Sequence, residues 1–157
     1  MKKSKPAVLK GVTKKNDEMY LLAVTSSAGG LEALTSLFKN LPPSDSLNIC
    51  IVVAQHLSPR HKSHMVDLLA KDSKWPIKEA SNHSKLEKGV IYISPPNRDI
   101  SINERAIVLS KPSADVGPKP SGDLLFKSVA ENYKEKAIAL VLSGTNTDGS
   151  LGVKEIS

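Results

Sequence analysis

The sequence has little of three features that define whole classes of protein. It has one cysteine, Cys50, so no disulfide can form within the chain. Aromatic residues make up 4% of the 157 residues, too few for the base-stacking platform of a nucleic-acid binder. No apolar run approaches the roughly 18–20 residues of a membrane-spanning helix, and no signal peptide is recognisable. These absences favour a cytoplasmic protein without membrane insertion.

Positive charge is in excess, but much of it lies in one short segment. The formal net charge is +6 and the calculated pI is 9.4. Much of the excess comes from Lys2, Lys3, Lys5, Lys10, Lys14 and Lys15. We interpret residues 1–18 as a disordered basic tail, and the remaining charge as a solvated surface that would suit an acidic partner. Cys50 lies in the apolar run NICIVV, which predicts a buried, unreactive thiol.

Unbroken apolar runs predict buried strands. The three longest are YLLAVTS (20–26), NICIVVAQ (48–55) and AIALVLSG (137–144). Shorter strands are predicted at 76–80 and 89–96. The alternating residues 99–110 predict a β-hairpin that turns at Asn103-Glu104.

Helical periodicity fills the segments between these strands. The first predicted helix begins at Gly29-Gly30 and has Leu31, Leu34, Leu37 and Phe38 on one face. The second spans 61–71 with Met65, Leu68 and Leu69 facing inward. The third runs from a cap at Ser121 or Asp123 to about Lys134. Alternating strands and helices predict an α/β fold, a three-layer doubly wound domain with a mostly parallel sheet and one hairpin. We assign residues 19–157 to this domain. The chain stops inside a further predicted helix, so we expect the C-terminal part of the domain to be missing.

Three polar residues follow the three buried strands. Ser27, His56 and Asp148 each come just after one of them. In an open parallel sheet, sites form beyond the carboxyl ends of the strands, so these side chains would converge. A serine hydroxyl needs a base to take its proton, and a carboxylate can hold that base in the right tautomer. The three residues therefore predict acyl transfer.

The serine lies in a variant of the G-x-S-x-G turn, Thr25-Ser26-Ser27-Ala28-Gly29. Such a turn would leave the N–H groups of Ala28, Gly29 and Gly30 at a helix N-terminus, where they would stabilise an oxyanion. Other interpretations stay open at this point: Ser26 as the reactive serine, a phosphate-binding turn, an ordinary loop histidine at His56 and a helix cap at Asp148.

Two further groups have side chains that can bind ligands. His61 and His64 have a spacing that suits a metal, but no third ligand is evident, so we expect solvated side chains and no metal site. Arg98 follows the double proline after the strand at 89–96. It would either contact an acidic substrate or brace its own loop.

Four segments together resemble a known family, the CheB-type protein-glutamate methylesterases. They are SAGGLEAL (27–34), QHLSP (55–59), IYISPPNRD (91–99) and LSGTNTDG (142–149). Their order and spacing agree with the family over residues 20–157, which is far more specific than any one of them alone.

The resemblance implies a catalytic triad of Ser27, His56 and Asp148, with an oxyanion-hole amide at Thr145. It implies hydrolysis of glutamyl methyl esters on chemoreceptor signalling helices, with deamidation of glutamine as a side activity. It implies no metal and no cofactor. The Ser-Ala-Gly-Gly variant is similar to the forms fused to a CheR-type methyltransferase, so a fused or associated methyltransferase domain is a further expected partner.

The sequence also departs from the family pattern. Thr25 and Asn146 stand where the family usually has glycine, and asparagine is the best substitute where φ is positive. The family's domain continues beyond Ser157, and no receiver domain precedes the catalytic part here, so we expect no phospho-aspartate control within this chain. These departures favour, as the alternative, a catalytically inactive regulatory or docking module of the same fold. A phosphate-binding module is the third hypothesis.

Overall fold

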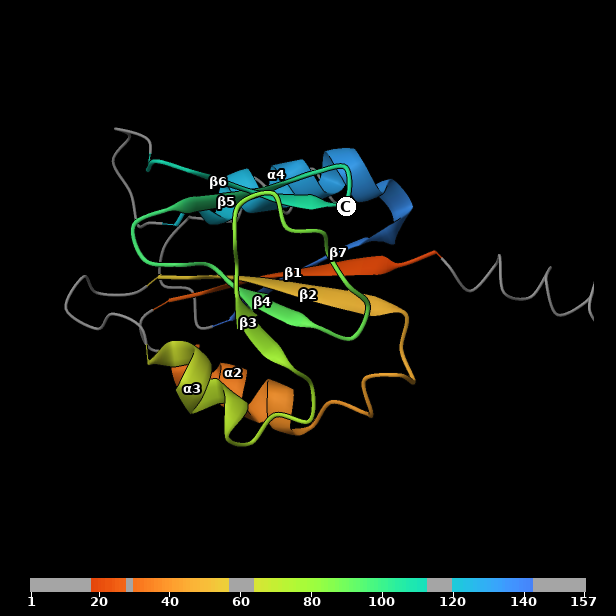
Figure 1. Cartoon of the computed structure of the whole chain (residues 1–157), viewed down its shortest axis with the longest axis vertical. Coiled ribbons are helices and arrows are strands. Elements are labelled where there is room, and N and C mark those ends of the chain that lie inside the picture. Colours follow the sequence, from red (N-terminus) through yellow and green to blue (C-terminus); the bar gives the residue numbers. More distant parts are fainter. Residues whose placement is uncertain (1–17, 28–29, 57–63, 113–119, 143–157) are drawn as a thin grey trace, which may run out of the picture.

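The computed structural model describes residues 18–27, 30–56, 64–112 and 120–142, and they form three layers (Figure 1). The middle layer is a five-stranded sheet. Its strands, in spatial order, are β3 (Ile77–Glu79), β4 (Ile91–Ile93), β2 (Ile49–Gln55), β1 (Tyr20–Ser26) and β7 (Ala137–Leu142). Every neighbouring pair is parallel, which confirms the parallel sheet that the unbroken apolar runs predicted.

The register of the three long strands brings their ends to one level. Ser26, the last residue of β1, pairs with Gln55 of β2 on one side and with Leu142 of β7 on the other. The carboxyl ends of β1, β2 and β7 therefore lie next to one another at one edge of the sheet, which we call the carboxyl edge.

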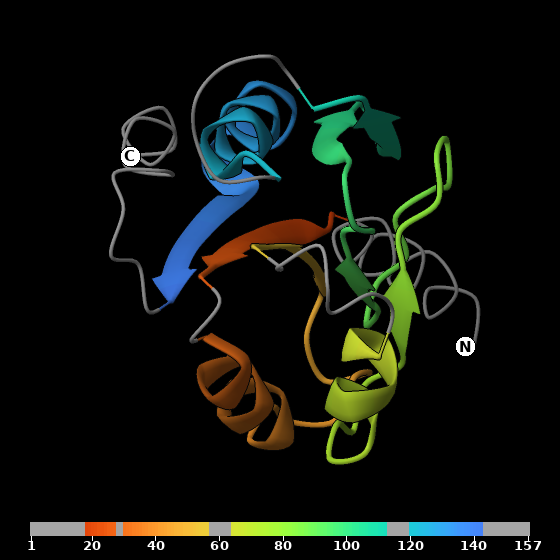
Figure 2. The ribbon, with the colours of Figure 1, turned by 90° about the vertical axis from the view of Figure 1, so that its left-hand side faces the viewer.

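Alternate residues of the strands face two separate cores, one on each side of the sheet. One core joins Leu21, Ala23 and Val52 to Leu125, Phe126 and Val129 of α4 (Gly122–Tyr133). The other joins Val24, Ile51 and Val53 to Leu34 and Phe38 of α2 (Leu31–Lys39) and to Met65 and Leu69 of α3 (Met65–Ala70). Figure 2 shows the sheet between the two sets of helices.

The predicted hairpin, β5 (Asp99–Asn103) and β6 (Ala106–Ser110), lies beside α4 in the same outer layer (Figure 1). Two polar side chains of α4 join the backbone of β5. Ser128 Oγ accepts from Ile102 N at 2.9 Å, and Asn132 Nδ2 donates to Ile102 O at 3.0 Å. The helix therefore satisfies backbone groups on an edge of the hairpin that would otherwise be open.

The predicted start of α4 is also confirmed. Ser121, one of the two candidates, is the cap, because its Oγ accepts from Leu124 N at 3.3 Å. The N–H of Ser121 donates in turn to the buried carboxylate of Asp99 at 2.8 Å. The first residue of the hairpin thus fixes the beginning of the helix.

Three details of the sequence-based prediction were wrong. Leu68 of α3 is 44% exposed, because in this short helix only Met65 and Leu69, four residues apart, reach the core. The hairpin turns at Glu104-Arg105, since Asn103 still pairs with Ala106 and the left-handed residue is Glu104, with φ of 56°.

The third detail concerns the predicted tail. Glu18, assigned to it, belongs to the folded part of the chain. Its carboxylate pairs with Lys136 at 2.8 Å, and its carbonyl accepts from the side-chain amide of Asn48. Residues 1–17 and 61–63 lie outside the described residues.

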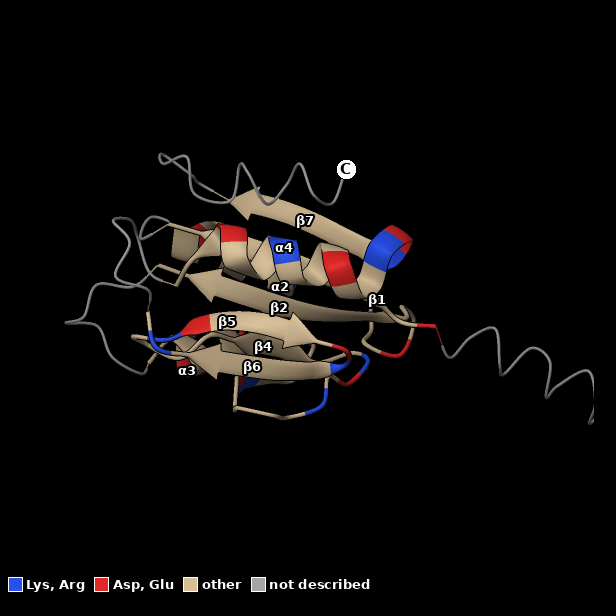
Figure 3. Ribbon diagram, turned by 90° about the horizontal axis from the view of Figure 1, so that it is seen from above, with Lys and Arg blue, Asp and Glu red and all other residues tan. Residues whose placement is uncertain are grey.

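The charged residues of the described surface are mixed in sign. Along α4, Asp123, Lys127 and Glu131 follow one another at intervals of four residues (Figure 3). Basic proteins that bind nucleic acid instead gather their positive side chains on one face. In the described part of the chain, no helix is long and apolar enough to cross a membrane.

Cys50 lies in the middle of β2 and is fully buried. Burial raises the pKa of its thiol to about 12, because the thiolate would lose its hydration there. The expectation of a buried thiol is confirmed, and its raised pKa argues against Cys50 as a nucleophile.

Candidate active site

Two of the three predicted catalytic residues are neighbours at the carboxyl edge. Ser27 directly follows Ser26 of β1, and His56 directly follows Gln55 of β2, and these two strand residues are paired. The backbone N–H of His56 donates to the carbonyl of Ser26 at 2.9 Å, so the ladder itself holds His56. Adjacent strands are about 4.8 Å apart, which brings a serine and a histidine to within reach of one another.

The two adjacent serines, Ser26 and Ser27, differ in burial. Ser26 is 1% exposed, and its Oγ donates to the carbonyl of Ser27 at 3.3 Å. A Cβ on Gly30 would collide with this hydroxyl, so Ser26 fills the space beneath the turn. Ser27 lies beyond the end of the strand and is only partly buried. Of the two serines, Ser27 is the more exposed.

A backbone hydrogen bond joins Gly30 to Ser27, between the end of β1 and the start of α2. The N–H of Gly30 donates to the carbonyl of Ser27 at 2.8 Å, and α2 begins at the next residue. Gly30 has φ of −86°, so it is needed for lack of a side chain rather than for a left-handed backbone. Ala28 and Gly29, the other predicted oxyanion donors, lie outside the described residues.

Sequence reasoning missed the role of Gln55. Its side chain is 1% exposed, and its Nε2 donates to the carbonyl of Ser27 at 2.8 Å across the two strand ends. The signal was a polar residue at the end of an otherwise apolar run, on the side of β2 that faces the core under α2. Ser94, which follows β4, completes this edge, since its Oγ accepts from the backbone of Gln55 at 3.4 Å.

The remaining predicted residues are only partly placed. Arg98 is exposed in the turn between β4 and β5, and its Nη1 donates to the carbonyl of Asn97 at 2.9 Å. This bond stays within the turn, and both roles that the sequence allowed for Arg98 remain predictions. Asp148 and Thr145 lie outside the described residues. The last described residue before them, Leu142, pairs with Ser26, so β7 leads to this edge.

Thr25, one of the two departures from the family pattern, is a regular strand residue. It pairs with Ala54 and Val141 and is buried. Among the residues that the structure describes, no group of three or more histidine, cysteine, aspartate or glutamate side chains is arranged to hold a metal ion. What the described part of the edge offers is a hydroxyl next to an imidazole, a pair of groups that acyl transfer can use.

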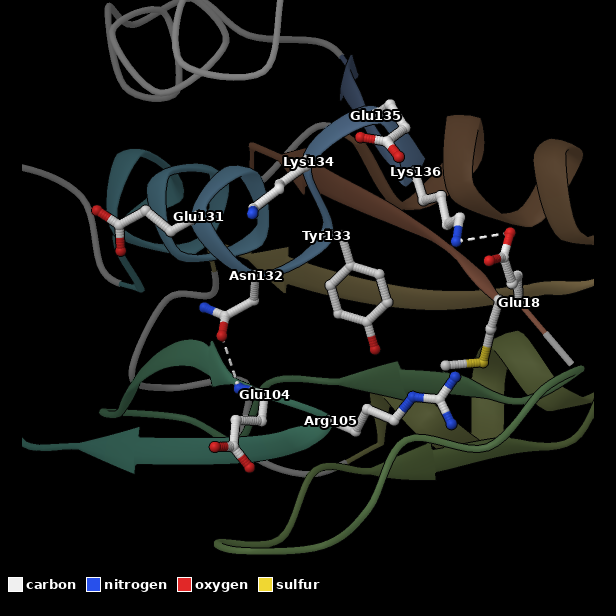
Figure 4. Close-up of a pocket in the computed structure, with 10 residues that line it drawn as sticks. Glu18, Glu104, Arg105, Glu131, Asn132, Tyr133, Lys134, Glu135 and Lys136 are labelled. Carbon is white, nitrogen blue, oxygen red and sulfur yellow. Dashed lines mark hydrogen bonds and ion pairs between the residues drawn. The ribbon is translucent and has the colours of Figure 1, made fainter.

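A hollow lies at the opposite edge of the sheet, where β1 and β7 begin. Its volume is about 630 Å³, and Glu18, Met19, Glu104, Arg105, Glu131, Asn132, Tyr133, Lys134, Glu135 and Lys136 line it. Figure 4 shows charges of both signs around it, with the Glu18–Lys136 ion pair on one side. β1 separates the two edges by its seven residues, roughly 20 Å. This hollow is therefore distinct from the Ser27 site.

The chain is similar to proteins of one known family. The family model "CheB methylesterase" matches residues 22–157. The chain is 34% identical to a protein-glutamate methylesterase/protein-glutamine glutaminase of Methanosarcina acetivorans, over 92% of this chain and 42% of that protein. It is 32% identical to a putative enzyme of the same name from Leptospira interrogans, over 90% of this chain and 72% of that protein.

The fold has a solved counterpart. The crystal structure of the Thermotoga maritima CheB methylesterase catalytic domain superposes with a TM-score of 0.76 and 28% sequence identity, covering 88% of this chain and 74% of that one. The chain thus spans less than half of the Methanosarcina protein and about three quarters of the Thermotoga domain. It belongs to the CheB methylesterase family.

Proposed function

We propose that this chain is the catalytic part of a protein-glutamate methylesterase, with Ser27 as the nucleophile. The observation that carries the proposal is the pairing of two strand ends: Ser27 and His56 each follow one residue of the Ser26–Gln55 pair. The family membership and the names of the relatives supply the reaction class. The substrate would be a glutamyl methyl ester on a chemoreceptor signalling helix.

The reaction would proceed in two steps. Ser27 Oγ attacks the ester carbonyl while His56 takes the hydroxyl proton, and the C–O bond to the methoxy group breaks as His56 returns that proton to methanol. Water then attacks the acyl-serine, again losing a proton to His56, and the glutamate leaves as Ser27 regains its hydrogen. Asp148 would hold the imidazole in the required tautomer. With a glutamine substrate the same steps would release ammonia.

The developing oxyanion needs fixed N–H donors. The peptide groups after Ser27 are the natural source, because the turn leads directly into α2, whose first N–H groups have no partners within the helix. Ala28, Gly29 and Thr145 remain the predicted donors, whereas the N–H of Gly30, also predicted, donates to the Ser27 carbonyl at 2.8 Å in this structure. Arg98 remains the predicted contact to an acidic receptor helix.

The proposal is tested with the full-length protein, by measuring methanol release from a methylated cytoplasmic fragment of a receptor. We expect turnover by the wild type and a fall of about 10³-fold or more in Ser27→Ala and His56→Ala. Ser46→Ala is the matched control, because Ser46 is exposed and bonds only to the nearby Pro43 carbonyl. Binding of the receptor fragment by a folded wild type without any turnover would replace this proposal with the docking-module hypothesis.

A further inference from the structure

We infer that Gln55 is a positioning residue for Ser27: its side-chain amide ties the turn that carries the Ser27 hydroxyl to the strand that carries His56. The inference rests on the proposed esterase function. The buried side-chain amide of Gln55 would hold Ser27 in position relative to His56, which no residue of the triad does.

The contact is specific in its chemistry. The carbonyl of Ser27 can only accept hydrogen bonds, so the NH₂ group of Gln55 must face it, and the two atoms are 2.8 Å apart. The same carbonyl accepts from Gly30 N at 2.8 Å and from Ser26 Oγ at 3.3 Å. A single carbonyl with three donors around it has little freedom to turn.

The three hydrogen bonds to the Ser27 carbonyl connect different parts of the chain. Those from Ser26 and Gly30 lie within the turn or next to it, so they would move with the turn. The bond from Gln55 crosses to another strand. The N–H of the next residue, His56, donates to the carbonyl of Ser26, so the last residue of β2 and the residue after it hold the turn and the end of β1. β2 therefore sets the position of the nucleophile relative to the base.

The side-chain oxygen of Gln55 gives a second argument that the residue is there for its bond to Ser27. Gln55 Oε1 is buried and has no hydrogen-bond partner among the residues that the structure describes. An unsatisfied buried carbonyl costs free energy that an apolar residue of similar size would avoid. Stability alone would favour leucine or methionine at the end of this apolar strand, whereas a positioning role requires an N–H donor.

The test uses two variants and two readouts on the protein as the cell produces it. Gln55→Met fills a similar volume without an N–H group. Gln55→Glu carries a carboxyl that donates to the Ser27 carbonyl only while it is protonated. The first readout is the rate at which an alkyl fluorophosphonate modifies Ser27. The second is hydrogen exchange of the Gly30 amide, which reports on the turn independently of any reaction.

Ser128→Ala is the matched control, because Ser128 is buried but its hydroxyl bonds the backbone of Ile102 and Leu125, which lie outside the carboxyl edge. We expect Gln55→Met to slow the modification by about 10–100-fold, the effect of a small misplacement of a reacting group. Exchange at Gly30 should rise about tenfold as the turn opens locally. Exchange at the Leu68 amide, which lies in α3, should not change.

Rescue distinguishes positioning from a loss of packing. Relative to wild type at the same pH, Gln55→Glu should react nearly normally while its carboxyl is protonated and should fall to the level of Gln55→Met once it ionises. Because burial raises a carboxyl pKa, we expect this change above the usual glutamate range. A general packing defect would lower both variants equally at every pH.

The outcomes separate the two proposals. If wild type reacts at Ser27 and Gln55→Met reacts equally fast, or if Gly30 exchange is unchanged in that variant, the positioning role is wrong while the esterase proposal stands. If folded wild type is not modified at Ser27 at all, the esterase proposal fails, and the positioning role fails with it.

Discussion

The hydroxyl of Ser26 occupies the space that a side chain on Gly30 would need. An ideal Cβ on Gly30 would lie 2.9 Å from Ser26 Cβ and closer still to Ser26 Oγ, whereas the next nearest atom, the carbonyl oxygen of Leu142, would be 3.8 Å away. The two residues are thus matched in size across the turn that carries Ser27. This match explains why a glycine stands there although its φ suits any residue.

Gly30→Ala should therefore destabilise the protein by about 1–3 kcal/mol, the usual cost of inserting a methyl group into a packed site. The double variant Gly30→Ala/Ser26→Gly should be about as stable as Ser26→Gly alone, because removing the Ser26 side chain frees the space. Denaturant unfolding followed by fluorescence measures both, since Trp75, the one tryptophan of the sequence, is buried. Additive free-energy changes in the double variant would contradict the match.

The bond between α4 and the hairpin yields a second prediction. Ser128→Ala should lower the free energy of unfolding by about 1–3 kcal/mol, because the N–H of Ile102 would lose its acceptor in the core. Ser46→Ala, which alters an exposed hydroxyl, should change it by no more than about 0.5 kcal/mol. Equal effects of the two substitutions would show that the α4–β5 bond contributes nothing to stability.

The buried thiol of Cys50 predicts that the free energy of unfolding falls at alkaline pH. Its folded pKa is about 12, above the ordinary value of 9.0, so the unfolded chain releases the thiol proton first. This contribution to stability is intact below pH 9 and is lost as the pH rises toward 12. The loss is at most about 1.4 kcal/mol per pH unit.

The measurement is the difference in unfolding free energy between wild type and Cys50→Ala, followed from pH 8 upward. The difference should shrink in favour of the variant as the pH rises, because alanine has no proton to lose. In the native state at pH 8, the thiol should also resist a disulfide reagent that modifies it at once in denaturant. A difference that does not vary with pH would contradict the buried thiol.

Much of the fold was predictable because a strand that is buried on both faces has an unbroken run of apolar residues. Runs such as NICIVVAQ can only be central strands or buried helices, and their length and β-branched residues select strands. Leu68 was mispredicted for the converse reason. A six-residue helix has too few turns for its pattern to say which of two adjacent leucines faces the core.

The site was predictable to the extent that it depends on where strands end. That Ser27 and His56 are neighbours was predictable, because each follows a buried strand and such ends lie at one edge of a parallel sheet, whereas their catalytic roles remain predictions. The partnership of Gln55 with the Ser27 carbonyl was not predictable, because it depends on the register of β1 against β2 and on the direction of one side chain. Asp148 remains a prediction.

The central claim, that Ser27 and not Ser26 is the nucleophile and that His56 activates it, is tested most directly by mapping the modified serine. The protein as the cell produces it is treated with a fluorophosphonate, digested, and the modified peptide is sequenced by mass spectrometry. We expect the phosphonyl group on Ser27 alone, and its loss in His56→Ala. Modification at Ser26, or labelling of Ser27 that is unchanged in His56→Ala, would contradict the account.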